Sequence, residues 1–377
     1  MIDTRAFITA LQQRGVGLFT GVPDSLLQDF SAALHNDLPA QQHIIAANEG
    51  NAIALAMGHY LGTGKPAVVY MQNAGLGNTV NPLTSLADPE VYGVPMLMVI
   101  GWRGEPGKKD EPQHVKQGRI TCAQLELLDI PHWVLDAESD IEAILGAAWQ
   151  AMAAGQPAAL VVRAGTFSKV SLQAVPTGPS ALLREEAIAA LLQCLGEHDS
   201  LVATTGKTGR ELFELRAHRG ENQRDFLTVG GMGHTASLAL GIALAQPQRR
   251  VVCLDGDGSL LMHMGALPVI AEQSPKNLLH ILLNNRAHES VGGQPTVAGQ
   301  VDFRAVALGC GYQGYFAASS VEQVQSVLAD INTSGAAGPL LFEIHLAQGS
   351  RPDLGRPTRT PQQNKQAVMQ HLGVEHA

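Results

Sequence analysis

Two oxygen-bearing side chains follow two apolar stretches that are typical of buried strands. Asp257 stands between Gly256 and Gly258 directly after the first stretch, and Asn285 ends the second. Because the carboxyl ends of neighbouring parallel strands meet at one edge of a sheet, these side chains are expected to lie close together. Carboxylate and amide oxygens, with a backbone carbonyl, suit magnesium, and glycine lets the backbone approach a phosphate. Either half alone is common turn chemistry, but the pair predicts a site for a magnesium-bound diphosphate.

A further segment joins an apolar stretch to a helical one and offers amides, hydroxyls and an ammonium group to a diphosphate. It lacks the first glycine of a P-loop, so it is not a nucleotide motif of that kind. The hydroxyl of Ser259, at the start of another predicted helix, adds a possible donor. The candidate diphosphate residues of the segment are Thr205, Gly206, Lys207 and Thr208.

The pairing of Asp257 with Asn285 resembles the motif of thiamine diphosphate enzymes. Such an enzyme needs a carboxylate beside the aminopyrimidine ring, because protonation of the ring turns its exocyclic amine into a base. Glu49 fits this role, since it follows a short apolar stretch and precedes a helix predicted over 52–61. The alternative is an acidic residue that only complements the helix dipole.

The glycine-rich segment 228–234 lies between a predicted strand and a helix predicted over 235–245. In a thiamine diphosphate enzyme, a large apolar residue among glycines can hold the two cofactor rings in a bent conformation. Met232 is the candidate for that contact, and the Gly230 carbonyl is the candidate acceptor for the amine. The alternative is a flexible connector in which Met232 only fills a gap.

Strand-like and helix-like segments alternate in two series, one up to about residue 162 and the other from about 201 to 344. This alternation predicts an α/β fold with two doubly wound parallel-sheet domains. Glu49 falls in the first and the diphosphate motif in the second. The tail is polar and is predicted to contain a short helix over 362–372. The predicted parts are a pyrimidine-binding domain over 1–165, a linker over 166–181, a diphosphate-binding domain over 182–348 and a C-terminal tail over 349–377.

The composition limits the partners. The 377 residues are 45% hydrophobic and 16% charged, enough for two filled cores, and the net charge of −9 argues against nucleic acid or an anionic membrane as a partner. The four cysteines lack metal-ligand spacing, and the chain shows neither a signal peptide pattern nor an apolar run long enough to span a membrane. A cytoplasmic protein with reduced thiols is expected.

A narrower resemblance covers nearly the whole chain and points to the phosphonopyruvate decarboxylases. It implies two domains without a central one, and decarboxylation of 3-phosphonopyruvate to phosphonoacetaldehyde in phosphonate biosynthesis, with thiamine diphosphate and Mg²⁺. It also implies a homodimer or larger assembly, in which Glu49 of one chain faces Asp257 and Asn285 of another, and a metal contact from the Ala287 carbonyl. The segments that carry the resemblance are Gly21–Ser25, Met71–Asn78, Gly101–Gly104 and Ala287–Thr296.

Two positions depart from the family pattern. Arg286 stands where a glycine commonly follows the asparagine pair, so the loop conformation is an open question. Val291 stands where several related decarboxylases place a proton-donating carboxylate. The proton that replaces the lost carbon dioxide must therefore come from Asp24, His288 or water.

The implied substrate is an anionic 2-oxo acid with roughly three negative charges, which calls for local cations. Arg103, Lys108 and Lys109 leave the end of a predicted strand and are candidates to bind the phosphonate, together with Arg286. The alternative is a solvated loop of mixed charge, because acidic residues such as Asp110 stand among the cations. A second tier of candidate cations comprises Lys207, Arg351 and Arg356.

Three other functions remain open from the sequence. A sulfopyruvate decarboxylase would differ chiefly in one substrate charge. A carboligase of the acetolactate synthase kind is disfavoured by the absence of a middle domain. A non-catalytic protein that binds the cofactor would be expected to have lost Glu49.

Overall fold

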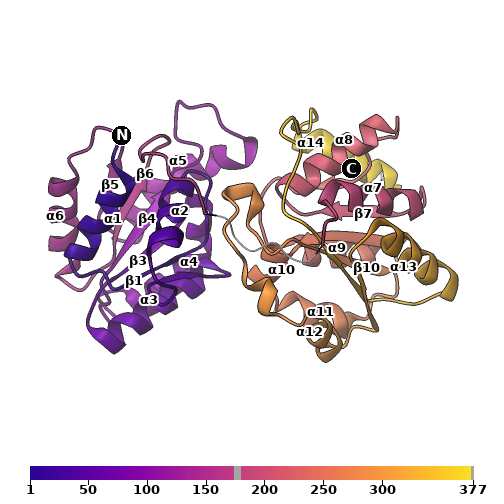
Figure 1. Cartoon of the computed structure of the whole chain (residues 1–377), viewed down its shortest axis with the longest axis horizontal. Coiled ribbons are helices and arrows are strands. Elements are labelled where there is room, and N and C mark those ends of the chain that lie inside the picture. Colours follow the sequence, from indigo (N-terminus) through magenta and orange to yellow (C-terminus); the bar gives the residue numbers. More distant parts are fainter. Residues whose placement is uncertain (174–179, 375–377) are drawn as a thin grey trace. The chain divides into compact units, whose positions relative to one another are not determined.

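The structure is a computed structural model that describes residues 1–173 and 180–374. The chain divides into two compact units, Met1–Val175 with His288–Pro295, and Pro176–Ala287 with Thr296–Ala377. Each unit contains a six-stranded parallel sheet with helices on both faces (Figure 1). The predicted α/β fold class is therefore confirmed. The predicted linker includes residues 174–179, which lie outside the described residues, so the domain limits stay a prediction.

The first unit is built from residues that are buried on both sides of its sheet. Its strands are β1 (Leu18–Gly21), β2 (His43–Ile45), β3 (Ala67–Gln72), β4 (Met96–Gly101), β5 (His132–Leu135) and β6 (Ala158–Val162), and its helices are α1 (Thr4–Gln13), α2 (Gln28–Asp37), α3 (Glu49–Thr63), α4 (Leu76–Pro82), α5 (Pro112–Leu127) and α6 (Ile141–Met152). The strand order is β2-β1-β3-β4-β6-β5. Val68 and Tyr70 of β3 pack with α1, α2 and α6, whereas Val69 and Met71 pack with α3, α4 and α5. A strand covered on both faces is apolar along nearly its whole length, as β4 is, and as β3 is up to Met71.

The second unit repeats this arrangement. Its strands are β7 (Ser200–Ala203), β8 (Phe226–Leu227), β9 (Val251–Gly256), β10 (Leu278–Asn284), β11 (Gly314–Ala318) and β12 (Leu340–His345), and its helices are α7 (Arg184–Cys194), α8 (Lys207–His218), α9 (Thr235–Ala245), α10 (Asp257–Met262), α11 (Ala266–Gln273), α12 (Phe303–Cys310), α13 (Val321–Ser334) and α14 (Pro361–His371). The strand order is β11-β12-β10-β9-β7-β8. One hydrophobic core lies between the sheet and helices α7, α8 and α13. The other lies between the sheet and helices α9, α10, α11 and α12.

The order of strands in the second unit determines where the candidate residues meet. Strands β8, β7, β9 and β10 are consecutive neighbours, and all are parallel. The segments that follow them therefore leave the same edge of the sheet. These four segments contain the predicted diphosphate and magnesium residues.

Some element limits differ from the predictions. Helix α3 begins at Glu49 rather than at residue 52, because the Asn48 side chain caps it by accepting from the Gly50 amide at 2.8 Å. The helix predicted over 235–245 is confirmed, and the tail helix is α14. No described helix has the length and apolar character needed to cross a membrane.

Candidate active site

Asp257 is the first residue of α10 and follows β9 directly. Its side chain is 2% exposed and accepts a hydrogen bond from Thr296 Oγ1 at 2.5 Å. Burial raises the pKa of Asp257 to about 6, while hydrogen bonds from Thr296 and from the Gly258 and Asn285 backbones oppose this increase. The structure thus brings Asp257 and the Asn285 backbone into contact, as the spacing predicts.

The asparagine pair at the end of β10 is fixed by its own contacts. Asn285 is buried, and its Oδ1 accepts from the Ala287 amide at 3.1 Å. Asn284 Nδ2 donates to Glu343 Oε1 at 2.7 Å, and the Tyr315 hydroxyl donates to Glu343 Oε2 at 2.7 Å. Neighbouring strands therefore orient the turn that presents Asn285. Glu343 and Tyr315 were not among the predicted site residues, because nothing in their local sequence marks them as polar partners.

Arg286 adopts a left-handed backbone conformation with φ of 60°. Its amide donates to Asn284 Oδ1 at 3.2 Å, and its carbonyl accepts from the Thr296 amide at 3.0 Å. The turn that a glycine would favour therefore forms here with an arginine. This answers the question of loop conformation that the departure from the family pattern raised.

The glycine-rich segments lie at the same sheet edge. Gly206, with φ of 98°, immediately precedes Lys207, the first residue of α8, and Thr208 is buried in the first turn. Ser259 Oγ accepts from the Gly233 amide at 3.1 Å, which ties segment 228–234 to α10. Within that segment Met232 is partly exposed. The segments after β7, β8 and β9 thus form one cluster of glycine, hydroxyl and amide groups.

Two observations test whether this cluster fits a magnesium-bound diphosphate. The Asp257 carboxylate is buried, and a divalent cation would offset the cost of burying its charge. Thr204 Oγ1, at the end of β7, is also buried and finds no hydrogen-bond partner among the described residues. A buried hydroxyl without a partner is unfavourable unless a ligand satisfies it. The residues present therefore fit the group.

Glu49 is 6% exposed, and its carboxylate lies against segment 71–78. Oε2 accepts from Asn78 Nδ2 at 2.7 Å. A Cβ at Gly75 would lie 2.5 Å from Oε1, so only glycine leaves room for the carboxylate in this position. Asn78 and Gly75 were missed as site residues, although their segment of glycines and asparagines after β3 was a visible signal.

Asp24 lies in a second polar group at the carboxyl ends of β1, β3 and β4. It is fully buried, and Gln72 Nε2 donates to its Oδ1 at 2.7 Å. Burial raises the pKa of Asp24, and the hydrogen bond from Gln72 and the charge of Arg103 oppose the increase. This carboxyl group therefore holds its proton to a higher pH than an exposed aspartate does.

Arg103 is held by the protein. Its Nε and Nη2 donate to Asp110 at 2.8 and 2.5 Å, and its Nη1 donates to Ser25 Oγ at 2.8 Å. Arg103 is therefore offset by Asp110, as in the alternative of a loop of mixed charge. Lys108 and Lys109, from the same loop, are exposed. Among the second-tier cations, Arg351 pairs with Glu185 and Glu214 and anchors the tail.

His288 belongs to the first unit, as part of segment His288–Pro295. Its amide donates to the Gln294 carbonyl at 2.8 Å, and Gln294 Nε2 donates to Ser31 Oγ of α2 at 2.8 Å. Desolvation lowers the pKa of His288 to about 4. The imidazole is therefore neutral near pH 7 and is a weak acid there.

Comparison with known proteins agrees with this geometry. Residues 4–127 match the family "Thiamine pyrophosphate enzyme, N-terminal TPP binding domain", and residues 205–344 match the family "Thiamine pyrophosphate enzyme, C-terminal TPP binding domain". Thiamine pyrophosphate is another name for thiamine diphosphate. The first match contains Glu49, and the second contains Asp257 and Asn285.

Three relatives narrow the family. The chain is 37% identical over 381 residues to phosphonopyruvate decarboxylase of Streptomyces viridochromogenes, which covers 96% of this chain and 92% of the relative. It is 30% identical over 345 residues to sulfopyruvate decarboxylase of Methanosarcina acetivorans, which covers 84% of each. Sulfopyruvate decarboxylase subunit beta of Methanothermobacter thermautotrophicus is 37% identical over 169 residues, which covers 45% of this chain and 84% of the subunit. The chain therefore belongs to the thiamine diphosphate-dependent decarboxylases, in the family that includes phosphonopyruvate decarboxylase and sulfopyruvate decarboxylase.

Proposed function

We propose that this protein decarboxylates 3-phosphonopyruvate to phosphonoacetaldehyde and carbon dioxide, as a step of phosphonate biosynthesis. The observation that carries the proposal is the pair of buried acids, Glu49 in contact with Asn78 and Asp257 in contact with the Asn285 backbone, within a chain that matches a phosphonopyruvate decarboxylase over 92% of that relative's length. The thiamine diphosphate cofactor supplies a nucleophilic carbon and stores the electrons released when carbon dioxide leaves. Residues of this chain hold the cofactor, bind the substrate and donate the proton.

Each group of residues has a proposed role in holding the cofactor. Asp257, Asn285 and the Ala287 carbonyl would hold Mg²⁺, whose charge would offset that of the diphosphate. Amides and hydroxyls of the segments after β7 and β9 hold the diphosphate oxygens. The Gly230 carbonyl and the Met232 side chain contact the rings. The Glu49 carboxylate receives a hydrogen bond from the aminopyrimidine and stabilises its protonated form.

The proton donor to the product is proposed to be Asp24 rather than His288. Burial raises the pKa of Asp24, so this carboxyl group keeps its proton to a higher pH than an exposed aspartate does, as a proton donor requires. Burial has the opposite effect on the imidazole, whose pKa of about 4 leaves little of the cationic form at neutral pH. Lys108 and Lys109, with Arg286, are the proposed partners of the phosphonate, because Arg103 is engaged by Asp110.

We also propose that the active unit is a homodimer or a larger assembly of this chain. Helix α3, which begins with Glu49, exposes the apolar side chains of Leu55 and Leu61. Ile44 of β2 and Val80 of α4, a helix that contacts α3, are also exposed. Exposed apolar groups around a candidate catalytic residue are typical of surfaces that are covered in an assembly. The relative that is itself named a subunit supports the same proposal. A cytoplasmic location stays a prediction.

The substrate is tested by measuring carbon dioxide release with added thiamine diphosphate and Mg²⁺. We expect kcat/KM for phosphonopyruvate to exceed that for sulfopyruvate, and that for pyruvate to be lowest. A preference for sulfopyruvate would favour the second candidate, which the similarity to the Methanosarcina protein keeps open. Condensation of two pyruvates would indicate a carboligase, and cofactor binding without carbon dioxide release would indicate a non-catalytic protein.

Gly75→Ala is expected to lower kcat by about tenfold or more, because the new Cβ would displace the Glu49 carboxylate from a distance of 2.5 Å. Cofactor affinity should change little, since Gly75 does not belong to the diphosphate cluster. Gly77→Ala is the matched control, because nothing lies within 4 Å of a Cβ at that position. Steady-state kinetics of both variants test the prediction, and equal kcat values would contradict it.

Magnesium affinity is expected to depend on pH through Asp257. Its pKa of about 6 means that protons compete with the metal below that pH, so the apparent affinity should fall by about tenfold per pH unit there. Above pH 6 the carboxylate is ionised and the affinity should level off. Calorimetric titration with Mg²⁺ and thiamine diphosphate from about pH 5 to about pH 7.5 measures this profile. A flat profile would show that Asp257 is not a ligand.

A further inference from the structure

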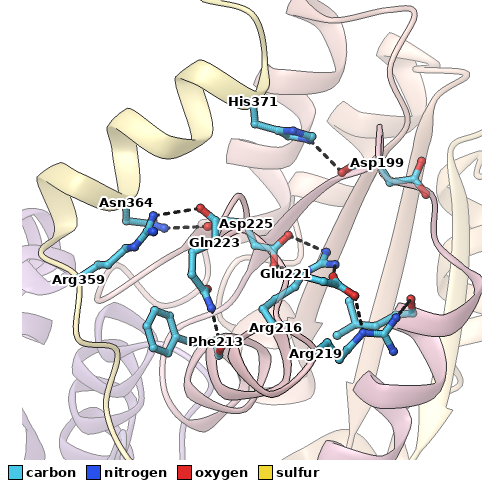
Figure 2. Close-up of polar contacts among 11 residues, drawn as sticks. Asp199, Phe213, Arg216, Arg219, Glu221, Gln223, Asp225, Arg359, Asn364 and His371 are labelled. Atoms are coloured by element: carbon cyan, nitrogen blue, oxygen red, sulfur yellow. Dashed lines mark hydrogen bonds and ion pairs between the residues drawn. The ribbon is translucent and has the colours of Figure 1, made fainter.

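The C-terminal helix α14 covers the edge of the second sheet. Strand β8 is the last strand of that sheet, has only two residues and pairs with β7 on one side alone. On its other side, Asn364 of α14 takes the place of a neighbouring strand. Asn364 Nδ2 donates to the Asp225 carbonyl at 2.8 Å (Figure 2), and Asn364 Oδ1 accepts from the Leu227 amide at 3.1 Å.

The contact of Asn364 with β8 is buried, and an ion pair holds the neighbouring Asp225 in place. Asn364 is 8% exposed, and the Asp225 side chain forms a two-point ion pair with Arg216, at 2.8 and 3.0 Å. Figure 2 shows these residues in one network with Glu221. Two hydrogen bonds from one buried amide to two backbone groups fix the position of the strand more tightly than the two-residue ladder with β7 alone.

Strand β8 leads directly into the segment that is proposed to hold the cofactor rings. Thr228 follows β8 and is tied to β7, since its amide and its hydroxyl both donate to the Ala203 carbonyl. Further along the segment, the Gly233 amide donates to Ser259 Oγ of α10. Gly230 and Met232 lie between these two anchors, so the position of the segment follows the position of β8.

We propose that Asn364 is a positioning residue for the cofactor, which makes α14 part of the thiamine diphosphate site although it contacts neither substrate nor cofactor. This inference rests on the proposed function, because it assigns the segment after β8 to the cofactor rings. Helix α14 also lies outside the residues that match the thiamine pyrophosphate enzyme families. The tail is therefore assigned a role in cofactor binding that neither its own sequence nor those matches suggested.

Helix α14 has a second contact with the domain, which allows docking of the helix to be distinguished from positioning of β8. His371 Nε2, in its last turn, lies 3.3 Å from the Asp199 carbonyl oxygen (Figure 2). It also lies 3.0 Å from Arg249 Nη1. Asp199 immediately precedes β7, at the end of the sheet opposite to the diphosphate segments. Loss of His371 would loosen α14 without removing a contact to β8.

The test compares Asn364→Ala with His371→Ala and with Gln366→Ala, an exposed residue of the same helix. Thiamine diphosphate binding to the full-length protein is measured by calorimetry at saturating Mg²⁺, and kcat at saturating cofactor. We expect Asn364→Ala to raise the cofactor Kd by about tenfold, with kcat within about twofold of the wild type once the site is filled. His371→Ala and Gln366→Ala should leave the Kd nearly unchanged.

A second variant of the same size tests the contact from the other side, and thermal unfolding checks that both variants are folded. Asn364→Asp keeps the acceptor for the Leu227 amide but places a carboxylate oxygen against the Asp225 carbonyl, so its Kd is expected to rise at least as far as that of Asn364→Ala. An unchanged Kd in both Asn364 variants, or an equal increase in the His371 variant, would overturn the proposal. If the wild-type protein itself bound no thiamine diphosphate, the proposed function would fail instead, so the two failures are distinguishable.

Discussion

Glu49→Gln is expected to bind thiamine diphosphate with nearly wild-type affinity and to lose turnover by about 10²- to 10⁴-fold. An amide has the same shape as the carboxylate and can still contact Asn78, but it cannot stabilise a protonated aminopyrimidine as an anion does. The diphosphate contacts come from another part of the chain, so binding should persist. Calorimetry gives the affinity, and carbon dioxide release gives the turnover.

The control for this variant is Glu138→Gln, which removes one exposed carboxylate from the same unit. It should match the wild type in both measurements. Wild-type turnover in Glu49→Gln would remove Glu49 from the mechanism. A loss of cofactor binding equal to the loss of turnover would assign Glu49 to affinity rather than to activation of the cofactor.

Asp257→Asn is expected to weaken binding of Mg²⁺ and thiamine diphosphate by about 100-fold or more, because it removes the charged ligand while side-chain size is kept. Activity should fall in parallel and recover in part at high cofactor concentration. The free protein should remain folded, since the Thr296 hydroxyl can still donate to an amide oxygen and a buried charge is removed. Calorimetry and thermal unfolding with and without cofactor measure these effects.

Asp330→Asn, an exposed position on α13, is the matched control and should behave as the wild type. In the wild type, Mg²⁺ with thiamine diphosphate should raise the unfolding temperature, because a ligand that binds only the native state stabilises it. In Asp257→Asn that shift should disappear at the same concentrations. A full shift in the variant would show that the metal is held elsewhere.

The central strands of both sheets could be predicted from the sequence, whereas two edge strands could not. Strands β3, β4, β9 and β10 are buried on both faces, so most of their residues are apolar, although His280 interrupts the run in β10. The missed strands β5 and β11 lie at sheet edges, and most of their residues are only partly buried. An edge strand has a neighbour on one side only, so its sequence carries a weaker apolar signal.

Some residues of the candidate site could likewise be predicted from the sequence, and others could not. Asp257, Asn285 and Glu49 could be predicted because each stands next to a strand end, and local sequence shows strand ends. Their partners Thr296 and Asn78 come from segments far along the chain or after another strand, and only the folded sheet brings them into contact. The charge of a residue also does not show which group it pairs with. Arg103 was a predicted substrate cation, but the structure shows it paired with Asp110.

The left-handed conformation of Arg286 also has a consequence for the energetics of the loop. A side chain in this region of backbone space costs about 1 kcal/mol relative to glycine, which visits it freely. The Arg286 Cδ lies 3.6 Å from where a Cβ on Gly299 would stand, an ordinary van der Waals distance, so the stem of the side chain packs beside that glycine. The chain thus tolerates local strain beside the asparagine pair and in return holds a permanent positive charge there, which a glycine could not supply.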